Sequence, residues 1–205
     1  MGFDFAHGAG NLKLELHRHG PDFAVWCNYK YLNAGPGAVG GAFIHERHFD
    51  ADLPRLAGWW GHDKATRFQM PRDFAPIRSA EAWQLSNPPI VSLAALRASL
   101  DIFNEAGMDR IRLKSLALTG YLEQALLDAA VPGLEIATPG DPAGRGAQLS
   151  LRVKGAGPDV HDRLIAAGAV ADWREPDIIR VAPAPLYNRF AEMDDFAGML
   201  KQAVG

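Results

Sequence analysis

The chain has 205 residues, of which 48% are hydrophobic and 22% charged, and its 21 basic and 24 acidic residues give a formal net charge of −3. This composition excludes a disordered chain, and the lack of a basic excess argues against nucleic acid as a partner. A single cysteine, Cys27, excludes a disulfide framework and favours a reducing compartment, the cytoplasm. No apolar run reaches the ~18 residues of a membrane helix, so no membrane partner is expected.

The first part of the chain predicts strands of a sheet. Residues 22–27 form a short, mostly apolar run rich in β-formers, typical of a strand buried on both faces, and 40–45 predicts its neighbour. Residues 35–40 match the letters G-x-G-x-x-G of a dinucleotide-binding fingerprint. That fingerprint must open a helix, whereas a strand follows here, so we interpret the segment as a glycine-rich turn.

The second part of the chain predicts helices followed by a small α+β domain. Apolar residues recur at spacings of three and four through 90–130, which predicts two helices broken near Gly107. Further along, the pattern predicts strands at 134–138, 147–153 and 178–182, a helix at 161–167 and a last helix from about 188. We place the boundary between two domains at 90/91, within the window 85–105.

Lys30 lies where the predicted strand 22–27 leaves the core, between two tyrosines. A lysine there can be partly desolvated, which lowers its pKa as a Schiff-base amine requires. The alternative is a strand-end lysine whose ammonium reaches water.

Two further segments carry candidate binding residues. Asp4, close to His7, is either the counter-ion of a cationic heterocycle or the cap of a following helix. Trp59 and Trp60 form an aromatic pair in a glycine-flanked loop, a common binding element that can also be core.

Arg180 is flanked by apolar residues in the predicted strand 178–182. Such an arginine either forms an internal ion pair or binds a carboxylate through two hydrogen bonds. The histidine pairs 17/19 and 45/48 do not have the H-E-x-x-H spacing, and no metal site is expected.

Taken together, these residues resemble the kynureninase family. The resemblance rests on five blocks in the family's order and approximate spacing: GFDFAH at 2–7, DFAVWCNYKYLN at 22–33, GWWGH at 58–62, SNPPI at 86–90 and IRVAPAPLYN at 179–188.

This resemblance implies an α/β enzyme of the PLP-dependent transferase fold (fold type I). Residues 1–90 would be the C-terminal part of the PLP-binding large domain, with a mixed, mainly parallel sheet, and 91–205 a small C-terminal α+β domain. The implied cofactor is pyridoxal 5'-phosphate and the implied assembly a homodimer. The implied reaction is hydrolysis of L-kynurenine, and of 3-hydroxykynurenine, to anthranilate or 3-hydroxyanthranilate and L-alanine, in tryptophan catabolism and NAD biosynthesis.

The resemblance also implies a role for each matching residue. Lys30 would form the Schiff base with the cofactor and move protons at the substrate's α-carbon, and Asp4 would pair with the pyridinium nitrogen. His7 would contact the cofactor, while Tyr29 and Trp59 would hold its phosphate, Tyr29 also donating a proton. The substrate-binding residues implied are Asn87, which also contacts the cofactor, Arg180, which would bind the α-carboxylate, and Trp60, near the substrate's ring.

The chain departs from the family at its start, because only three residues precede Asp4. In this fold, the phosphate-binding loop and the aromatic side chain on the pyridine face come earlier. We therefore expect a fragment, a truncated reading frame, or half of a split enzyme whose N-terminal half is a separate chain. The alternatives to a kynureninase are a non-catalytic binding or dimerisation module and another activity of fold type I, aminotransferase or desulfurase-like.

Overall fold

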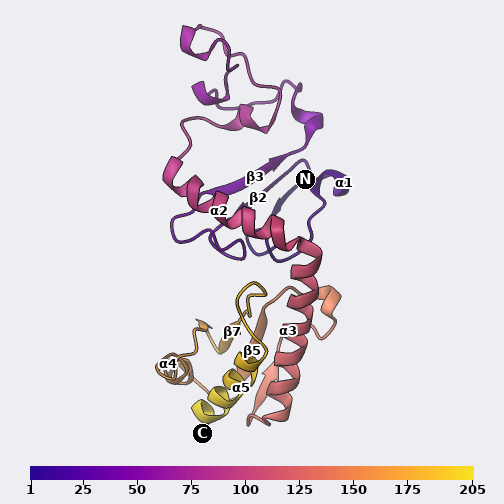
Figure 1. Cartoon of the computed structure of the whole chain (residues 1–205), viewed down its shortest axis with the longest axis vertical. Coiled ribbons are helices and arrows are strands. Elements are labelled where there is room, and N and C mark those ends of the chain that lie inside the picture. Colours follow the sequence, from indigo (N-terminus) through magenta and orange to yellow (C-terminus); the bar gives the residue numbers. More distant parts are fainter. The chain divides into compact units, whose positions relative to one another are not determined.

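The computed structural model describes all 205 residues, which form two compact units, Met1–Glu105 and Ala106–Gly205 (Figure 1). The division follows helix α2 (Ile90–Ala106), whereas the sequence placed it at 90/91. Helix α2 belongs with the first unit, and its Ser99 hydroxyl donates a hydrogen bond to the backbone oxygen of Leu32. That the units are part of a PLP-binding large domain and a small domain stays a prediction.

Unit 1 contains a three-stranded mixed sheet. Strand β1 (Gly2–Asp4) runs parallel to β2 (Phe23–Cys27), which pairs antiparallel with β3 (Gly40–Ile44). The predicted strands at 22–27 and 40–45 are thereby confirmed. A short helix, α1 (Leu16–His19), lies in the connection between β1 and β2.

The prediction that β2 is buried on both faces is wrong. Ala24 is fully buried, whereas Phe23 and Val25 are 47% and 45% exposed. Successive side chains of a strand point to opposite faces of the sheet, and unit 1 covers only one of these faces. The other face of β2 is therefore an exposed apolar surface.

The segment 35–40 is a turn, as predicted. Gly35 and Gly37 have φ angles of 84° and 76°, in the left-handed region that favours glycine, and the chain then enters β3 at Gly40. Between β3 and α2 the chain has no regular α-helix or strand, only short 3₁₀ turns at Glu46–His48, Trp59–Gly61, Arg67–Gln69 and Ala80–Trp83.

Unit 2 is a two-layer α+β unit with an antiparallel sheet in the order β4-β5-β7-β6. Its elements in chain order are α3 (Met108–Asp128), β4 (Leu134–Ile136), β5 (Leu149–Val153), α4 (Pro158–Ala166), β6 (Asp172–Arg174), β7 (Ile178–Val181) and α5 (Ala191–Val204). The predicted helix break is confirmed at Gly107, whose φ is 77°. Strand β6 was not predicted, because three residues are too few for a period-2 pattern to stand out.

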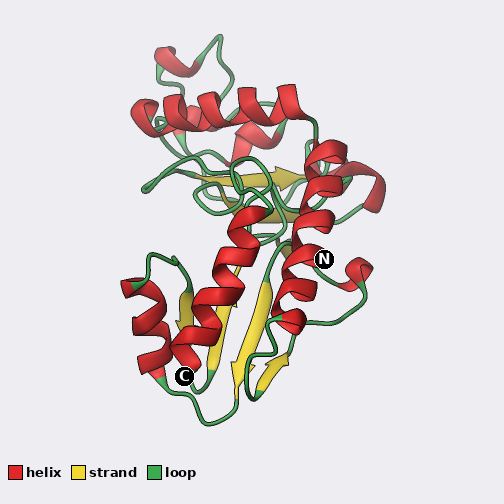
Figure 2. Ribbon diagram, turned by 60° about the horizontal axis from the view of Figure 1, so that its bottom comes forward, coloured by secondary structure: helices red, strands yellow, loops and turns green.

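The helices of unit 2 lie on one face of its sheet (Figure 2). Leu149, Leu151 and Ile179 on that face are at most 1% exposed and belong to one apolar cluster with side chains of α3, α4 and α5. Ser150 and Arg180 alternate with them and point to the opposite face. The alternation thus separates an apolar core from a polar face that the helices leave open. No helix in the chain is both long enough and apolar enough to span a bilayer.

Candidate active site

Asp4 and Lys30 lie at the same edge of the sheet in unit 1. Asp4 is the last residue of β1, and Lys30 lies in the turn that follows the end of β2 at Cys27. Because β1 and β2 are parallel, their carboxyl ends share one edge of the sheet, the usual place for a ligand site in such sheets.

The segments that follow these two strands pack directly against each other. The rings of His7 and Tyr31 meet edge-on, with centroids 5.9 Å apart. Gly10 approaches the backbone so closely that a Cβ there would lie 2.8 Å from the carbonyl carbon of Tyr31. The structure therefore places the predicted site residues Asp4, His7, Tyr29 and Lys30 on two segments that are in contact.

Lys30 is half-buried, and its Nζ lies 5.7 Å from the centre of the Tyr29 ring. Tyr29 itself is 50% exposed. A hydrogen bond with Cys27, and the charge of that side chain when ionised, raise the pKa of the Tyr29 phenol. A tyrosine phenol is already protonated at neutral pH, the state required of a proton donor, and this shift extends that state to higher pH.

The carboxylate of Asp4 is exposed, and only one of its two oxygens accepts a hydrogen bond. Its Oδ1 accepts a hydrogen bond of 2.7 Å from the backbone N–H of Ala6, so it caps the turn that follows β1. No other hydrogen bond to this carboxylate is present, which leaves Oδ2 able to pair with a cationic group. The two interpretations of Asp4, a cap and a counter-ion, are thus compatible.

Asn28 holds the turn that carries Lys30, a role that the sequence analysis missed. This 97% buried residue accepts a hydrogen bond from the Trp26 indole at 2.9 Å and donates one to the backbone oxygen of Val39 at 2.7 Å. Its own backbone oxygen accepts a bond from the N–H of Ala34. An asparagine directly after a predicted strand, where a turn starts, is the signal that could have identified it.

Trp59, Trp60 and Asn87 lie on two loops of unit 1 that touch. A Cβ on Gly58 would lie 2.2 Å from the Cα of Leu85, so only glycine allows the two loops to approach this closely. Trp59 is 41% exposed and makes edge-on ring contacts with Trp60 and Phe68. Asn87 is exposed, just before α2 begins.

A buried arginine supports this aromatic pair. The guanidinium of Arg67 lies over the Trp60 ring at 4.6 Å and donates a hydrogen bond to the backbone oxygen of His62. Arg67 is only 6% exposed, so it is part of the loop's interior. Trp60 is therefore held by packing, while Trp59 presents more of its ring to solvent.

Arg180, the predicted carboxylate ligand, belongs to unit 2 and lies on the open face of its sheet. It forms an internal ion pair with Asp172: its Nε donates to Asp172 Oδ2 at 2.7 Å, and its Nη2 donates to the same oxygen. The first of the two alternatives for Arg180 is thus observed. Its Nη1 donates no hydrogen bond, which leaves part of the guanidinium free for a second carboxylate.

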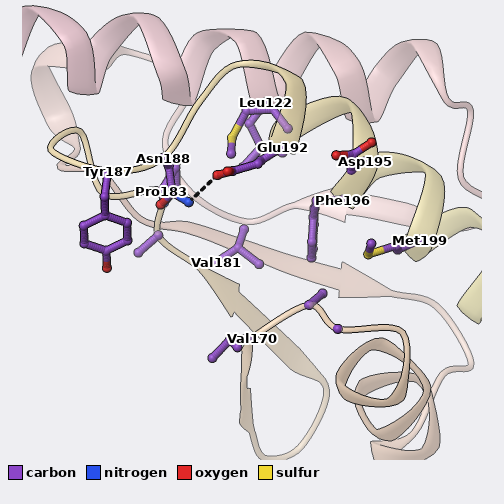
Figure 3. A pocket seen from close by; sticks show the side chains of 14 residues that line it. Leu122, Val170, Val181, Pro183, Tyr187, Asn188, Glu192, Asp195, Phe196 and Met199 are labelled. Carbon is purple, nitrogen blue, oxygen red and sulfur yellow. Dashed lines mark hydrogen bonds between the residues drawn. The ribbon is translucent and has the colours of Figure 1, made fainter.

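Unit 2 also contains a cavity of about 630 Å³ that the sequence did not indicate (Figure 3). It lies between α5, the end of β7 and residues 168–170, and its walls include Val181, Phe196 and Glu192. Val181 lines it but its neighbour Arg180 does not, because they point to opposite faces of the sheet. The cavity and the arginine are therefore separate features.

Solved structures with a similar fold define the class of protein. The chain superposes on a cysteine desulfurase from Thermococcus onnurineus with a TM-score of 0.80 and 19% identity, covering 99% of this chain and 52% of that one. For an alanine–glyoxylate aminotransferase from Nostoc sp. the TM-score is 0.73 and the identity 20%, over 100% of this chain and 53% of that one. The fold is that of the PLP-dependent enzymes of fold type I.

Sequence relatives define the family more closely. A kynureninase of Xanthomonas oryzae pv. oryzae is 59% identical over 98% of this chain and 48% of the relative, and one of Xanthomonas euvesicatoria is 60% identical over 96% and 47%. The family described as the kynureninase C-terminal domain matches residues 111–200. The chain belongs to the kynureninase family and spans about half the length of these relatives, corresponding to their C-terminal half.

Proposed function

We propose that this chain is the C-terminal half of a kynureninase that binds pyridoxal 5'-phosphate and hydrolyses L-kynurenine to anthranilate and L-alanine. The observation that carries the proposal is the placement of Asp4 and Lys30 at the same carboxyl edge of two parallel strands. It is supported by the high identity to kynureninases. The 3-hydroxylated substrate, the homodimer, the cytoplasm, and the role in tryptophan catabolism and NAD biosynthesis are part of the same proposal.

The residues at this edge fit the cofactor chemically. Pyridoxal phosphate needs an amine for its aldehyde and an acid opposite its ring nitrogen, and Lys30 and Asp4 supply these two groups. When bound, the cofactor withdraws electrons from the substrate's α-carbon. Trp59 would contribute its indole N–H to the phosphate, and His7 and Asn87 would make further contacts.

The protein residues then have three tasks in the reaction. Lys30 would accept the α-proton at Nζ, and the protonated Tyr29 phenol would donate a proton to the substrate. Arg180 would bind the α-carboxylate and orient the substrate. Overall, one water is added across the Cβ–Cγ bond: its hydroxyl goes to the aryl carbonyl carbon, giving anthranilate, and a proton goes to Cβ, giving alanine.

The first test is cofactor attachment. We expect the chain, co-expressed with the N-terminal half of the Xanthomonas oryzae relative, to retain pyridoxal phosphate and to carry it on Lys30 after borohydride reduction, as read by peptide mass. Lys30→Ala should abolish both the labelled peptide and the absorbance of the bound cofactor, whereas Lys13→Ala should leave them. A labelled wild-type protein that releases no anthranilate from kynurenine would contradict the proposed reaction.

A non-catalytic binding or dimerisation module is the second candidate. The same experiment separates the two, because a module would bind no cofactor either alone or with the N-terminal half.

A further inference from the structure

The open face of the unit 2 sheet carries a small charged cluster around Arg180. Asp172 on β6 and Arg180 on β7 are directly opposite in the antiparallel register, so both point to this face. Arg174, two residues along β6, lies on the same face and places its Nη2 3.2 Å from Asp172 Oδ2. The cluster is therefore two arginines around one carboxylate, with one net positive charge.

The geometry of the ion pair leaves one particular edge of the guanidinium available. A guanidinium can bind a carboxylate along its Nε–Nη2 edge or along its Nη1–Nη2 edge. A single oxygen, Asp172 Oδ2, accepts bonds from both Nε and Nη2 of Arg180. The Nε–Nη2 edge is thus occupied, and the Nη1–Nη2 edge, whose Nη1 has no partner, remains for a ligand.

The side chains differ in how freely they can move. The Arg180 side chain is 25% exposed, whereas those of Asp172 and Arg174 are 45% and 60% exposed. The third arginine on this face, Arg152, is already paired with Asp177 and Glu135. Arg180 is therefore the arginine of this face that is held most firmly while retaining a free donor edge.

We infer that Asp172 is a positioning residue for substrate: it holds Arg180 by the Nε–Nη2 edge and so presents the Nη1–Nη2 edge to the α-carboxylate of an amino acid. This inference rests on the proposed role of Arg180. A guanidinium held in one position binds a carboxylate in one orientation. The conformational entropy of the arginine side chain is then lost on folding and not on ligand binding. The second charge, from Arg174, offsets the repulsion between Asp172 and the incoming carboxylate.

The test compares two amines that differ by the carboxylate. The PLP-loaded protein, assembled with the N-terminal half of the Xanthomonas oryzae relative, is titrated with L-alanine and with ethylamine while the absorbance of the bound cofactor is followed. Asp172→Asn should weaken L-alanine binding about 10- to 100-fold, the range typical of losing an orienting partner, and leave ethylamine binding unchanged. Asp172→Glu should recover part of the loss.

Two controls separate positioning from folding. Asp177→Asn removes an acid on the same face that pairs with Arg152, and it should change neither titration by more than about threefold. The Arg180 Nε–H resonance, assigned through its loss in Arg180→Lys, should move upfield in Asp172→Asn while the rest of the spectrum stays folded.

Three results would overturn the inference. These are an equal effect of Asp172→Asn on both amines, no effect on either, or a wild-type protein with no preference for L-alanine over ethylamine. Failure of kynurenine hydrolysis alone would contradict only the proposed reaction, because the comparison of L-alanine with ethylamine does not depend on that turnover.

Discussion

At the scale of single residues, the site depends on polar groups that are buried for structural reasons. Asn28 is the clearest case, since its side chain bridges the Trp26 indole and the Val39 backbone just before Tyr29 and Lys30. The proposed Schiff-base role of Lys30 requires a fixed backbone, and this amide supplies it.

Replacing Asn28 tests that dependence. Asn28→Ala leaves the part-buried Trp26 indole N–H and Val39 carbonyl without this partner, and a lost hydrogen bond of this kind costs about 0.5–1.5 kcal/mol. We expect a lower free energy of unfolding by denaturant, by at least that amount. Asn33→Gly is the matched control: Asn33 is exposed with φ of 53°, which glycine adopts freely, so the change should stay within about 0.5 kcal/mol.

Gly58 offers a second test at this scale. A Cβ there would collide with the backbone of Leu85, so Gly58→Ala should separate the loops that carry Trp59 and Asn87 and lower stability by about 1–3 kcal/mol. Gly120→Ala, in α3 with nothing within 4 Å of the added Cβ, should instead raise stability by about 0.5–1 kcal/mol. Thermal unfolding of both variants measures the difference, and equal effects would disprove the steric argument.

At the scale of elements, the start of α5 is fixed by a polar network rather than by its apolar stripe. Asn188 accepts a bond from the Ala184 N–H and donates one to Glu192 Oε2, and the Arg189 N–H donates to the same oxygen (Figure 3). This network forms a turn first, so the helix begins at Ala191 and not near 188 as predicted. These bonds also lower the pKa of Glu192.

The lowered pKa of Glu192 gives a pH dependence with a definite sign. The unfolded chain protonates this carboxyl near its ordinary value of 4.5, whereas the folded chain holds it ionised to lower pH. The stabilisation of the folded chain by ionised Glu192 is therefore complete above about pH 4.5. It is lost as the pH falls through the lowered pKa of Glu192 in the folded chain. The melting temperature of wild type should exceed that of Glu192→Gln at neutral pH, and the gap should close in acid.

The control for this pH profile is Asp195→Asn. Asp195 also lines the cavity but forms no hydrogen bond or ion pair. Asp195→Asn should leave the melting temperature unchanged across the same pH range. A difference in melting temperature between wild type and Glu192→Gln that widens in acid would contradict the proposed effect of the Glu192 pKa.

At the scale of the whole molecule, the two units differ in how they are stabilised. The large contiguous apolar cluster of the chain lies entirely within unit 2. No such cluster of buried residues is found in unit 1, where Phe23 and Val25 of β2 are both exposed.

This difference predicts that unit 2 folds alone. A chain of residues 106–205 should show cooperative thermal unfolding with helix and strand signals in circular dichroism. Leu151→Ala leaves a cavity at a fully buried position and should lower the free energy of unfolding by about 2–5 kcal/mol. Leu127→Ala, at an exposed position, should lower it far less. A non-cooperative transition in the isolated unit would show that its core needs unit 1.

Much of the fold followed from local patterns in the sequence. The two long helices, their break at Gly107 and the turn at 35–40 depend on periodicity and on glycine, which act within a few residues. The short strand β6 and the exposure of Phe23 did not follow. Strand β6 has only three residues, too few for its alternation to stand out, although its partner β7 is close in the chain. The exposure of Phe23 depends on which segments cover its face of the sheet, and a local pattern carries no information about that.

The same distinction applies to the site. The sequence by itself determined the family and the candidates Lys30, Asp4 and Arg180, because each belongs to a block of matching residues whose chemistry is recognisable locally. Only the tertiary structure decided that Asn28 holds the lysine turn and that Asp172 engages one edge of Arg180. These partners come from separate strands and loops, and hydrogen bonds between them exist only once the chain has folded.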